Sequence, residues 1–449
     1  MGKGLFHLAV CTESPASMEP PRFIQELRQT LVLAAPIAAG HVSQMLLGVV
    51  DTLMIGRVGV VELAASALAL TIIHFIFVMG IGLLSSVSVL VSHAYGAGNL
   101  REAGELLRRG LAIALGSGLL MFVLIWSAFP LLGYLGQPEE VVVACKPYLW
   151  LLASSLPFMH VIICLRNYTE AQNIPWPAFW TGLASVLLNV FLNWVLIYGN
   201  LGAPALGLPG AGVATVIARA FNVAVLVLWL QKDPRFARAW PVRWFAAIPW
   251  RSLLEPLRLG FPIGLQILLE VGVFGMATIM MGWLGVVPMA SHQIAITCAA
   301  TTFMVPLGLS QALTIRVGHV LGAGQAQRAR RVAFGGLGFG IAWGGLFAVL
   351  FIAFSREIAG FFTQDPETLS LAASLLVIAG LFQIFDGSQV VGAGALRGCK
   401  DVRIPTWIML VAYWLVGLPV AAGLAFLLDW GARGVWTGLA AGLAVAAFS

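Results

Sequence analysis

Charged residues are scarce in this sequence. Only 10% of the 449 residues are Asp, Glu, Lys or Arg, whereas 60% are hydrophobic, and the mean hydropathy is +0.93. No soluble domain of this length has such a composition, so the sequence predicts an integral membrane protein that crosses the bilayer many times. The net charge of +6 comes from basic residues scattered over short loops, which argues against a nucleic-acid-binding surface.

Cysteine is also scarce, and the known catalytic motifs are missing. The five cysteines are odd in number and show no CxxC spacing, so we expect neither disulfides nor structural zinc. The sequence contains no nucleophile motif, Walker A loop, HExxH or paired catalytic carboxylates, which argues against an enzyme and against a bound cofactor. Any energy for work across the membrane would then come from an ion gradient. Residues 1–21 lack the long apolar core and the cleavage site of a signal peptide, and we interpret them as a tail.

Twelve apolar runs are long enough to cross a bilayer, which takes about 20 helical residues. They lie near 31–55, 63–92, 106–132, 141–165, 178–199, 208–231, 256–284, 289–315, 332–354, 368–396, 404–428 and 434–449. The predicted fold class is therefore all-α integral membrane, with 12 transmembrane helices. The last run is barely long enough to span, and we expect the native chain to continue beyond Ser449.

The second half of the sequence repeats the first. Shifting residues 259–324 back by 226 positions places Pro262 on Pro36, Glu270 on Gln44 and His319 on His93 without a gap. Six spans, an even number, separate the repeats, so both halves enter the membrane in the same direction and form two parallel six-helix lobes. We predict a cytoplasmic tail over 1–27, an N-lobe over 28–231, a cytoplasmic linker over 232–255 and a C-lobe over 256–449.

The basic residues predict the orientation in the membrane. Twenty of the 25 Lys and Arg residues lie in the N-terminal tail and in the loops after even-numbered spans, four lie in the other loops, and Arg219 alone lies inside a predicted span. Cytoplasmic loops are enriched in Lys and Arg. The sequence therefore predicts a multi-pass protein of the plasma (inner) membrane with a cytoplasmic N-terminus.

Three of the nineteen acidic residues, Asp51, Glu270 and Asp386, lie inside apolar runs. An ionisable group in a membrane span costs several kcal/mol and marks a functional site by default. The alternative is that each acid pairs with a base to hold helices together, but Arg219 could neutralise only one of them. A carboxylate in a low dielectric either takes up a proton or coordinates a cation, so the three acids are candidate coupling sites.

Polar and aromatic residues near these acids extend the candidate set. Asn189 and Asn193 are one helical turn apart, so their amide oxygens could ligate a cation or hydrogen-bond between helices, and Thr215 has the same two interpretations. Phe382 and Phe385 flank Asp386 closely enough to line an aromatic cavity for a cation, together with Glu270 and Asp386.

Other features have weaker functional interpretations. Pro36 and Pro262 occupy equivalent places in the first and seventh spans, where they act either as hinges or as static kinks. The glycines of Gly96-Ala97-Gly98 and of its repeat at 322–324 are interpreted as helix-ending turns rather than a nucleotide loop. Four intramembrane histidines lie on separate spans without metal-ligand spacing, and we expect them to be satisfied within the fold or to face a pore rather than to bind a metal: His41, His74, His160 and His292.

Four segments resemble matching segments of the multidrug and toxic compound extrusion family, NorM-type branch. They read VDTLMIGRVG, NVFLNWVLIYG, ILLEVGVFGMATIMMG and FDGSQVVGAGALRGCKDVRIP, and the similarity covers about 420 residues. The resemblance implies an antiporter that expels organic cations and other drugs in exchange for Na+ or H+. It also implies an N-lobe cation site at Asp51, Asn189, Asn193 and Thr215, and C-lobe coupling acids at Glu270 and Asp386.

The resulting hypothesis is alternating access between the two lobes of a functional monomer. Arrival of a cation or proton at the acids would weaken their hold on a cationic drug. The main alternative is a flippase for lipid-linked precursors with a related two-lobed architecture. A cavity for phosphate-linked glycans would be rich in Arg and Lys, whereas the spans predicted here contain only Arg219.

Overall fold

The computed structural model describes residues 23–134, 136–241, 244 and 246–449, and their regular structure is helical. Twelve helical segments within these residues are long and apolar enough to cross a membrane, which confirms the predicted number of spans. Helices suit this composition because a bilayer offers no water to backbone N–H and C=O groups, and a helix satisfies them internally.

The first half of the chain supplies six of these spans. Its helices are α1 (Phe23–Gly56), α2 (Val60–Gly96), α3 (Leu100–Ser127), α4 (Glu139–Ser154), α5 (Leu156–Glu170), α6 (Trp176–Tyr198) and α7 (Leu208–Lys232). α4 and α5 together form one span, broken at Ser155.

The second half repeats this arrangement. Its helices are α8 (Trp250–Leu284), α9 (Val286–Gly322), α10 (Ala326–Ala353), α11 (Ser355–Gly360), α12 (Pro366–Gly398), α13 (Arg403–Met409), α14 (Leu418–Ala422) and α15 (Gly431–Phe448). The span that begins with α13 contains two π-helical segments, Leu410–Gly417 and Gly423–Leu427.

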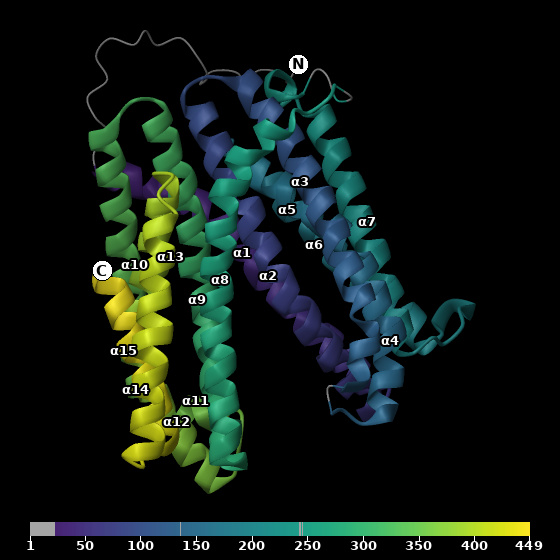
Figure 1. The fold of residues 1–449 in the computed structure, drawn as a ribbon, viewed down its shortest axis with the longest axis vertical. Coiled ribbons are helices and arrows are strands. Elements are labelled where there is room, and N and C mark those ends of the chain that lie inside the picture. The colour runs from purple at the N-terminus through teal and green to yellow at the C-terminus, as the bar shows by residue number, and fades with distance from the viewer. Residues whose placement is uncertain (1–22, 135, 242–243, 245) are drawn as a thin grey trace, which may run out of the picture.

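The two halves form two bundles that meet at the end of the molecule where α2 and α9 end, and diverge toward the end that carries α4 and α11 (Figure 1). The first helix of each half crosses to the opposite bundle. The N-terminal part of α1 shares a hydrophobic cluster with α9 and α12, and the beginning of α8 packs on α2. Each half therefore contributes one helix to the packing of the other.

Glycines allow the crossing helices to touch. A Cβ atom on Gly82 of α2 would lie 2.1 Å from the Cα atom of Gly264 of α8, so no larger residue fits at this contact. Small residues that bring helix backbones together are the usual basis of packing in membranes. The predicted helix-ending turns are confirmed, because Gly98 and Gly324 follow α2 and α9 with φ values of 73° and 75°.

The structure differs from the sequence-based boundaries at the start of α1. This helix begins at Phe23, inside the stretch that was predicted as tail, and Glu26 is buried there. Its carboxylate accepts a bond from Arg316 of α9 at 2.5 Å and also pairs with Arg328 of α10. The helix can begin with a buried acid because two guanidinium groups from the other half neutralise it.

Candidate functional site

The N-lobe residues singled out from the sequence lie together, where α1, α6 and α7 meet. Asn193 Nδ2 donates to Asp51 Oδ1 at 2.6 Å and to Asn189 Oδ1 at 3.1 Å. Asn189 Nδ2 in turn donates to Thr215 Oγ1 at 3.4 Å, and that hydroxyl donates to the carbonyl of Ala211. One chain of hydrogen bonds therefore joins all four predicted residues.

This N-lobe cluster also has unused acceptor capacity. Asn193 is fully buried, and its Oδ1 atom has no hydrogen-bond partner among the described residues. A buried, unpaired amide oxygen costs about 1–3 kcal/mol. Carboxylate, amide and hydroxyl oxygens are the ligands that hard cations prefer, so the donor set fits Na+, and the carboxylate alone fits a proton.

Arg219 lies beside this cluster without pairing directly with its acid. It follows Thr215 by one turn of α7, and its Nη1 atom donates to Ser155 Oγ at 2.5 Å. Arg219 and Asp51 interact electrostatically, but Asp51 forms no salt bridge with any residue that the structure describes. The alternative of a simple helix-holding ion pair is therefore not realised at this acid.

In the C-lobe, Glu270 of α8 and Asp386 of α12 lie close enough for their charges to interact. Asp386 is buried, Glu270 is half-buried, and neither forms a salt bridge within the described ranges. Two like charges in a low dielectric cannot both remain bare. Arg397 of α12 also interacts electrostatically with Glu270. Uptake of a proton or a shared cation by this pair would be the chemistry expected of a coupling site.

The family follows from comparison of the whole chain with known proteins. The MatE family model matches it twice, over residues 36–195 and 262–422. The chain belongs to the MatE family. The two matches begin at Pro36 and Pro262, the positions aligned by the internal repeat, and they contain Asp51 in the first half and Glu270 and Asp386 in the second.

Relatives of this MatE chain cover nearly its whole length. A protein from Xanthomonas axonopodis, named probable multidrug resistance protein NorM, is 36% identical over 426 residues, covering 95% of this chain and 93% of the relative. A protein of the same name from Pseudomonas aeruginosa is 38% identical, with 96% and 89% covered. A solved outward-facing MATE family transporter shares the fold, with a TM-score of 0.86, 19% identity and 96% of each chain covered.

Three polar residues of the MatE C-lobe were missed from the sequence. Both amide atoms of Gln266, the Oε1 atom of Gln389 and the hydroxyl of Tyr413 are buried and have no hydrogen-bond partner among the described residues. Gln266 precedes Glu270 by one turn of α8, and Gln389 follows Asp386 by one turn of α12. The missed signal was therefore an amide one helical turn from each acid.

Tyr413 reaches this C-lobe site from a third helix. It lies in the π-helical segment Leu410–Gly417, and its side chain interacts electrostatically with both Glu270 and Asp386. π-Helical turns are frequently found at functional sites. Trp414, the next residue, donates from Nε1 to the carbonyl of Leu269 at 3.1 Å and so fixes this segment against α8 beside Glu270.

The structure places Phe382 in the hydrophobic core of the C-lobe, and its role in a substrate cavity stays a prediction. This side chain is only 2% exposed and packs edge-on against Phe274 and Trp436, with ring centroids 6.0 Å and 5.7 Å apart. Phe385 is half-buried and packs against Phe448, with ring centroids 5.9 Å apart.

Most of the intramembrane histidines have partners. His41 contacts Gln311 at 3.3 Å, His160 donates to the carbonyl of Leu156, and His292 accepts from Trp436 Nε1. His74 of α2 is exposed. No group of three or more His, Cys, Asp and Glu side chains suited to a metal occurs in the part of the chain that the structure describes.

Proposed function

We propose that this protein is a secondary multidrug efflux antiporter, which exports organic cations and other drugs in exchange for Na+ or H+ and works as a monomer. The observation that carries the proposal is the pair Glu270 and Asp386, two interacting acids in the membrane with no salt-bridge partner among the described residues. The names of the relatives, probable multidrug resistance proteins, support the substrate class.

Coupling would arise from competition for negative charge. A proton or Na+ that arrives at Glu270 and Asp386 neutralises the charge that holds a cationic drug, and the drug leaves. Asp51, Asn189, Asn193 and Thr215 would form a second cation site in the N-lobe. An ion can drive alternating access only by its difference in affinity between the two conformations, so the acids must change their surroundings as the lobes move.

The proposed orientation places the N-terminus in the cytoplasm of a bacterial cell, with the protein in the inner membrane. In this orientation the bundles meet at the cytoplasmic end, where α2 and α9 end, and diverge at the other end (Figure 1). With this orientation the structure represents an outward-open state, in which drug leaves and the coupling ion enters.

A lipid-linked precursor flippase is the alternative with a related architecture. Phosphate-linked substrates require several cations along the path. In the N-lobe, Asp51 and Arg219 are one acid and one base. The structure places Arg397 of α12 near Glu270, but the two acids Glu270 and Asp386 still outnumber the one base at the C-lobe site. Acidic sites favour cationic substrates.

Ethidium efflux tests the proposed function. Cells that lack their own pumps would express the protein, or its Glu270→Gln, Asp386→Asn or Glu140→Gln variant, and efflux would be driven separately by a Na+ or a pH gradient. We expect efflux by the parent protein under one gradient and about a tenfold or greater loss in the two intramembrane variants, because each loses a charge that the ion and drug share.

Glu140→Gln is the matched control. Glu140 is an exposed residue at the start of α4, so this substitution should leave efflux unchanged. No ethidium efflux by the parent protein under either gradient would instead favour the flippase.

A further inference from the structure

A groove crosses the line where the two halves of the protein meet. Its volume is about 500 Å3, within the range of about 300–1,000 Å3 that is usual for small-molecule sites. α2 contributes Leu83, α8 contributes Leu254, Leu257 and Phe261, and the beginning of α13 closes one side. The walls are tied together, because Thr406 of α13 donates to the carbonyl of Pro262 in α8 at 3.0 Å.

Two arginines, Arg258 of α8 and Arg403 of α13, complete the lining. Both are exposed, and neither hydrogen-bonds or ion-pairs with any residue that the structure describes. The nearest acids along the chain are already engaged, since Glu255 pairs with Lys400 at 3.5 Å and Asp401 accepts from the backbone N–H of Ile404. The groove therefore combines apolar walls with two unneutralised positive charges.

The groove lies where a lipid headgroup would lie. It is at the ends of α8 and α13 that adjoin the interlobe linker, on the face that carries most of the basic residues. Phe261 is 57% exposed and projects an apolar surface that only the acyl region of a bilayer would favour. Basic pockets between transmembrane helices on the cytoplasmic side are typical sites for anionic lipid headgroups.

We propose that this groove binds one anionic phospholipid, whose phosphate pairs with Arg258 and Arg403 and whose acyl chain lies along Leu83, Leu257 and Phe261. The backbones of α2 and α8 touch beside it, because a Cβ atom on Gly260 would lie 2.3 Å from the carbonyl oxygen of Leu83. A ligand that contacts both halves here stabilises the arrangement in which they touch. The lipid thus favours closure of this face.

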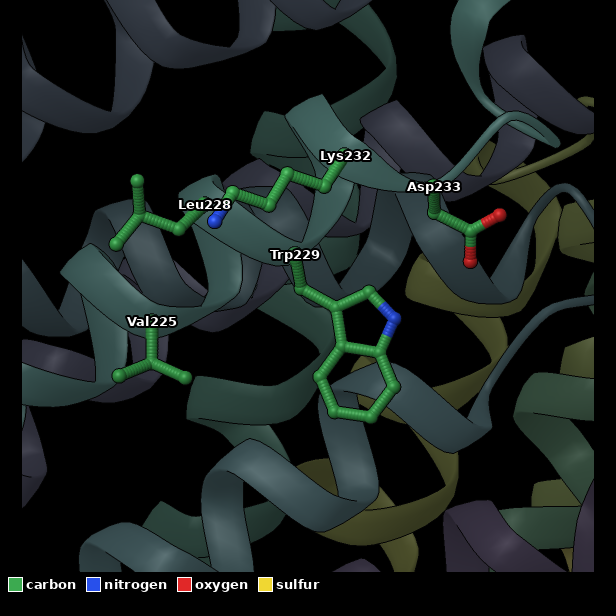
Figure 2. Close-up of a pocket in the computed structure, with 5 residues that line it drawn as sticks. All are labelled: Val225, Leu228, Trp229, Lys232 and Asp233. Carbon is green, nitrogen blue, oxygen red and sulfur yellow. The ribbon is translucent and has the colours of Figure 1, made fainter.

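A second groove provides an internal comparison (Figure 2). It has a volume of about 370 Å3 at the end of α7 and is lined by Val225, Leu228, Trp229, Lys232 and Asp233. The Arg235 side chain hydrogen-bonds to Asp233 and lowers the pKa of that carboxyl group, so it is ionised at neutral pH beside Lys232. This groove is lined by one basic residue rather than two and involves one helix, so Lys232 is the matched control residue.

Native mass spectrometry of the purified full-length protein tests the proposal. Protein in detergent would be titrated with phosphatidylglycerol or with phosphatidylcholine of the same acyl chains. We expect phosphatidylglycerol adducts to exceed phosphatidylcholine adducts, and the combined R258Q and R403Q substitutions to reduce the phosphatidylglycerol adducts about tenfold. K232Q should leave both unchanged. Equal binding of the two lipids by the parent protein, or unchanged phosphatidylglycerol binding by the double variant, would overturn the proposal.

Thermal unfolding distinguishes binding of the lipid from binding of a free anion. It also shows whether the double variant is folded. Phosphatidylglycerol should raise the unfolding midpoint of the parent protein but not that of the double variant, while inorganic phosphate should raise neither. A rise with inorganic phosphate equal to that with the lipid would exclude a lipid site. If the double variant unfolds before titration, R403Q alone must show the loss of adducts. Neither readout involves drug transport, so the result stands whether or not the efflux proposal holds.

Discussion

At the scale of residues, the candidate sites are recognised by polar atoms that the fold leaves without partners. Burying an unpaired amide costs about 1–3 kcal/mol, so a fold selected only for stability would replace such groups. The three intramembrane acids were predictable from the sequence, because a charge stands out in an apolar run. Gln266, Gln389 and Tyr413 were not, because amides and phenols are tolerated in membrane helices and only the fold shows that theirs lack partners.

The first prediction concerns Gln266, which is fully buried with both amide atoms unpaired among the described residues. Gln266→Leu should stabilise the protein by about 1–3 kcal/mol, because it removes an unsatisfied amide, and should weaken ion-coupled efflux, because it removes a candidate ligand. Thermal unfolding in detergent and ethidium efflux measure the two effects.

Gln383 provides the matched control, because it is equally buried but donates to the carbonyl of Ala299 and to Thr302 Oγ1 at 2.6 Å. Gln383→Leu should therefore destabilise the protein. If both substitutions shift the unfolding midpoint in the same direction, the missing hydrogen bonds of Gln266 do not lower the free energy of unfolding.

At the scale of elements, the sequence predicts the existence of the helices better than their ends. The apolar runs identify twelve spans, but the polar residues around Glu26 resemble a solvated tail. The helix begins at Phe23 because Glu26 pairs with Arg316 and Arg328, which are about 300 positions away in the sequence and adjacent only in the folded protein. A boundary that depends on such distant partners is not visible in a local pattern.

The second prediction follows from this buried cluster. Glu26→Gln should destabilise the protein by about 3–5 kcal/mol, because it leaves the buried Arg316 guanidinium without its counter-charge. Glu255→Gln, which breaks the exposed pair between Glu255 and Lys400, should cost no more than about 1 kcal/mol. Unfolding midpoints of the two variants, measured in the same detergent, should differ clearly. Equal midpoints would show that the cluster is not an energetic anchor of α1.

At the scale of the whole molecule, duplication produces contacts that each half makes on the other. His93 of α2 contacts the carbonyl of Gly398, at the end of α12, with Nε2 2.8 Å from the oxygen, and His319 of α9 contacts the carbonyl of Ala171, just after α5, at 2.6 Å. The histidines are 226 positions apart and their acceptors 227, so the two bonds are equivalent in the repeat. The sequence showed the histidines as a repeated pair, but the acceptors are backbone atoms, which no sequence pattern distinguishes.

These two bonds join the halves at the face where the bundles meet, so removing them should favour the opposite conformation. At about 0.5–1.5 kcal/mol for each bond, the combined change His93→Leu with His319→Leu should shift the population ratio by about 5- to 150-fold. Spin labels on cysteines introduced at Leu201 and Phe361, exposed residues in different halves at the diverging face, report the change as a new population at shorter distance.

Two variants serve as controls. His93→Gln with His319→Gln should retain the parent distribution, since a glutamine amide can still donate to each carbonyl. His74→Leu controls for losing an exposed histidine. If the leucine variant keeps the parent distance distribution, the two histidines do not hold this face closed, and other contacts between the halves, such as the glycine contacts between α2 and α8, must do so.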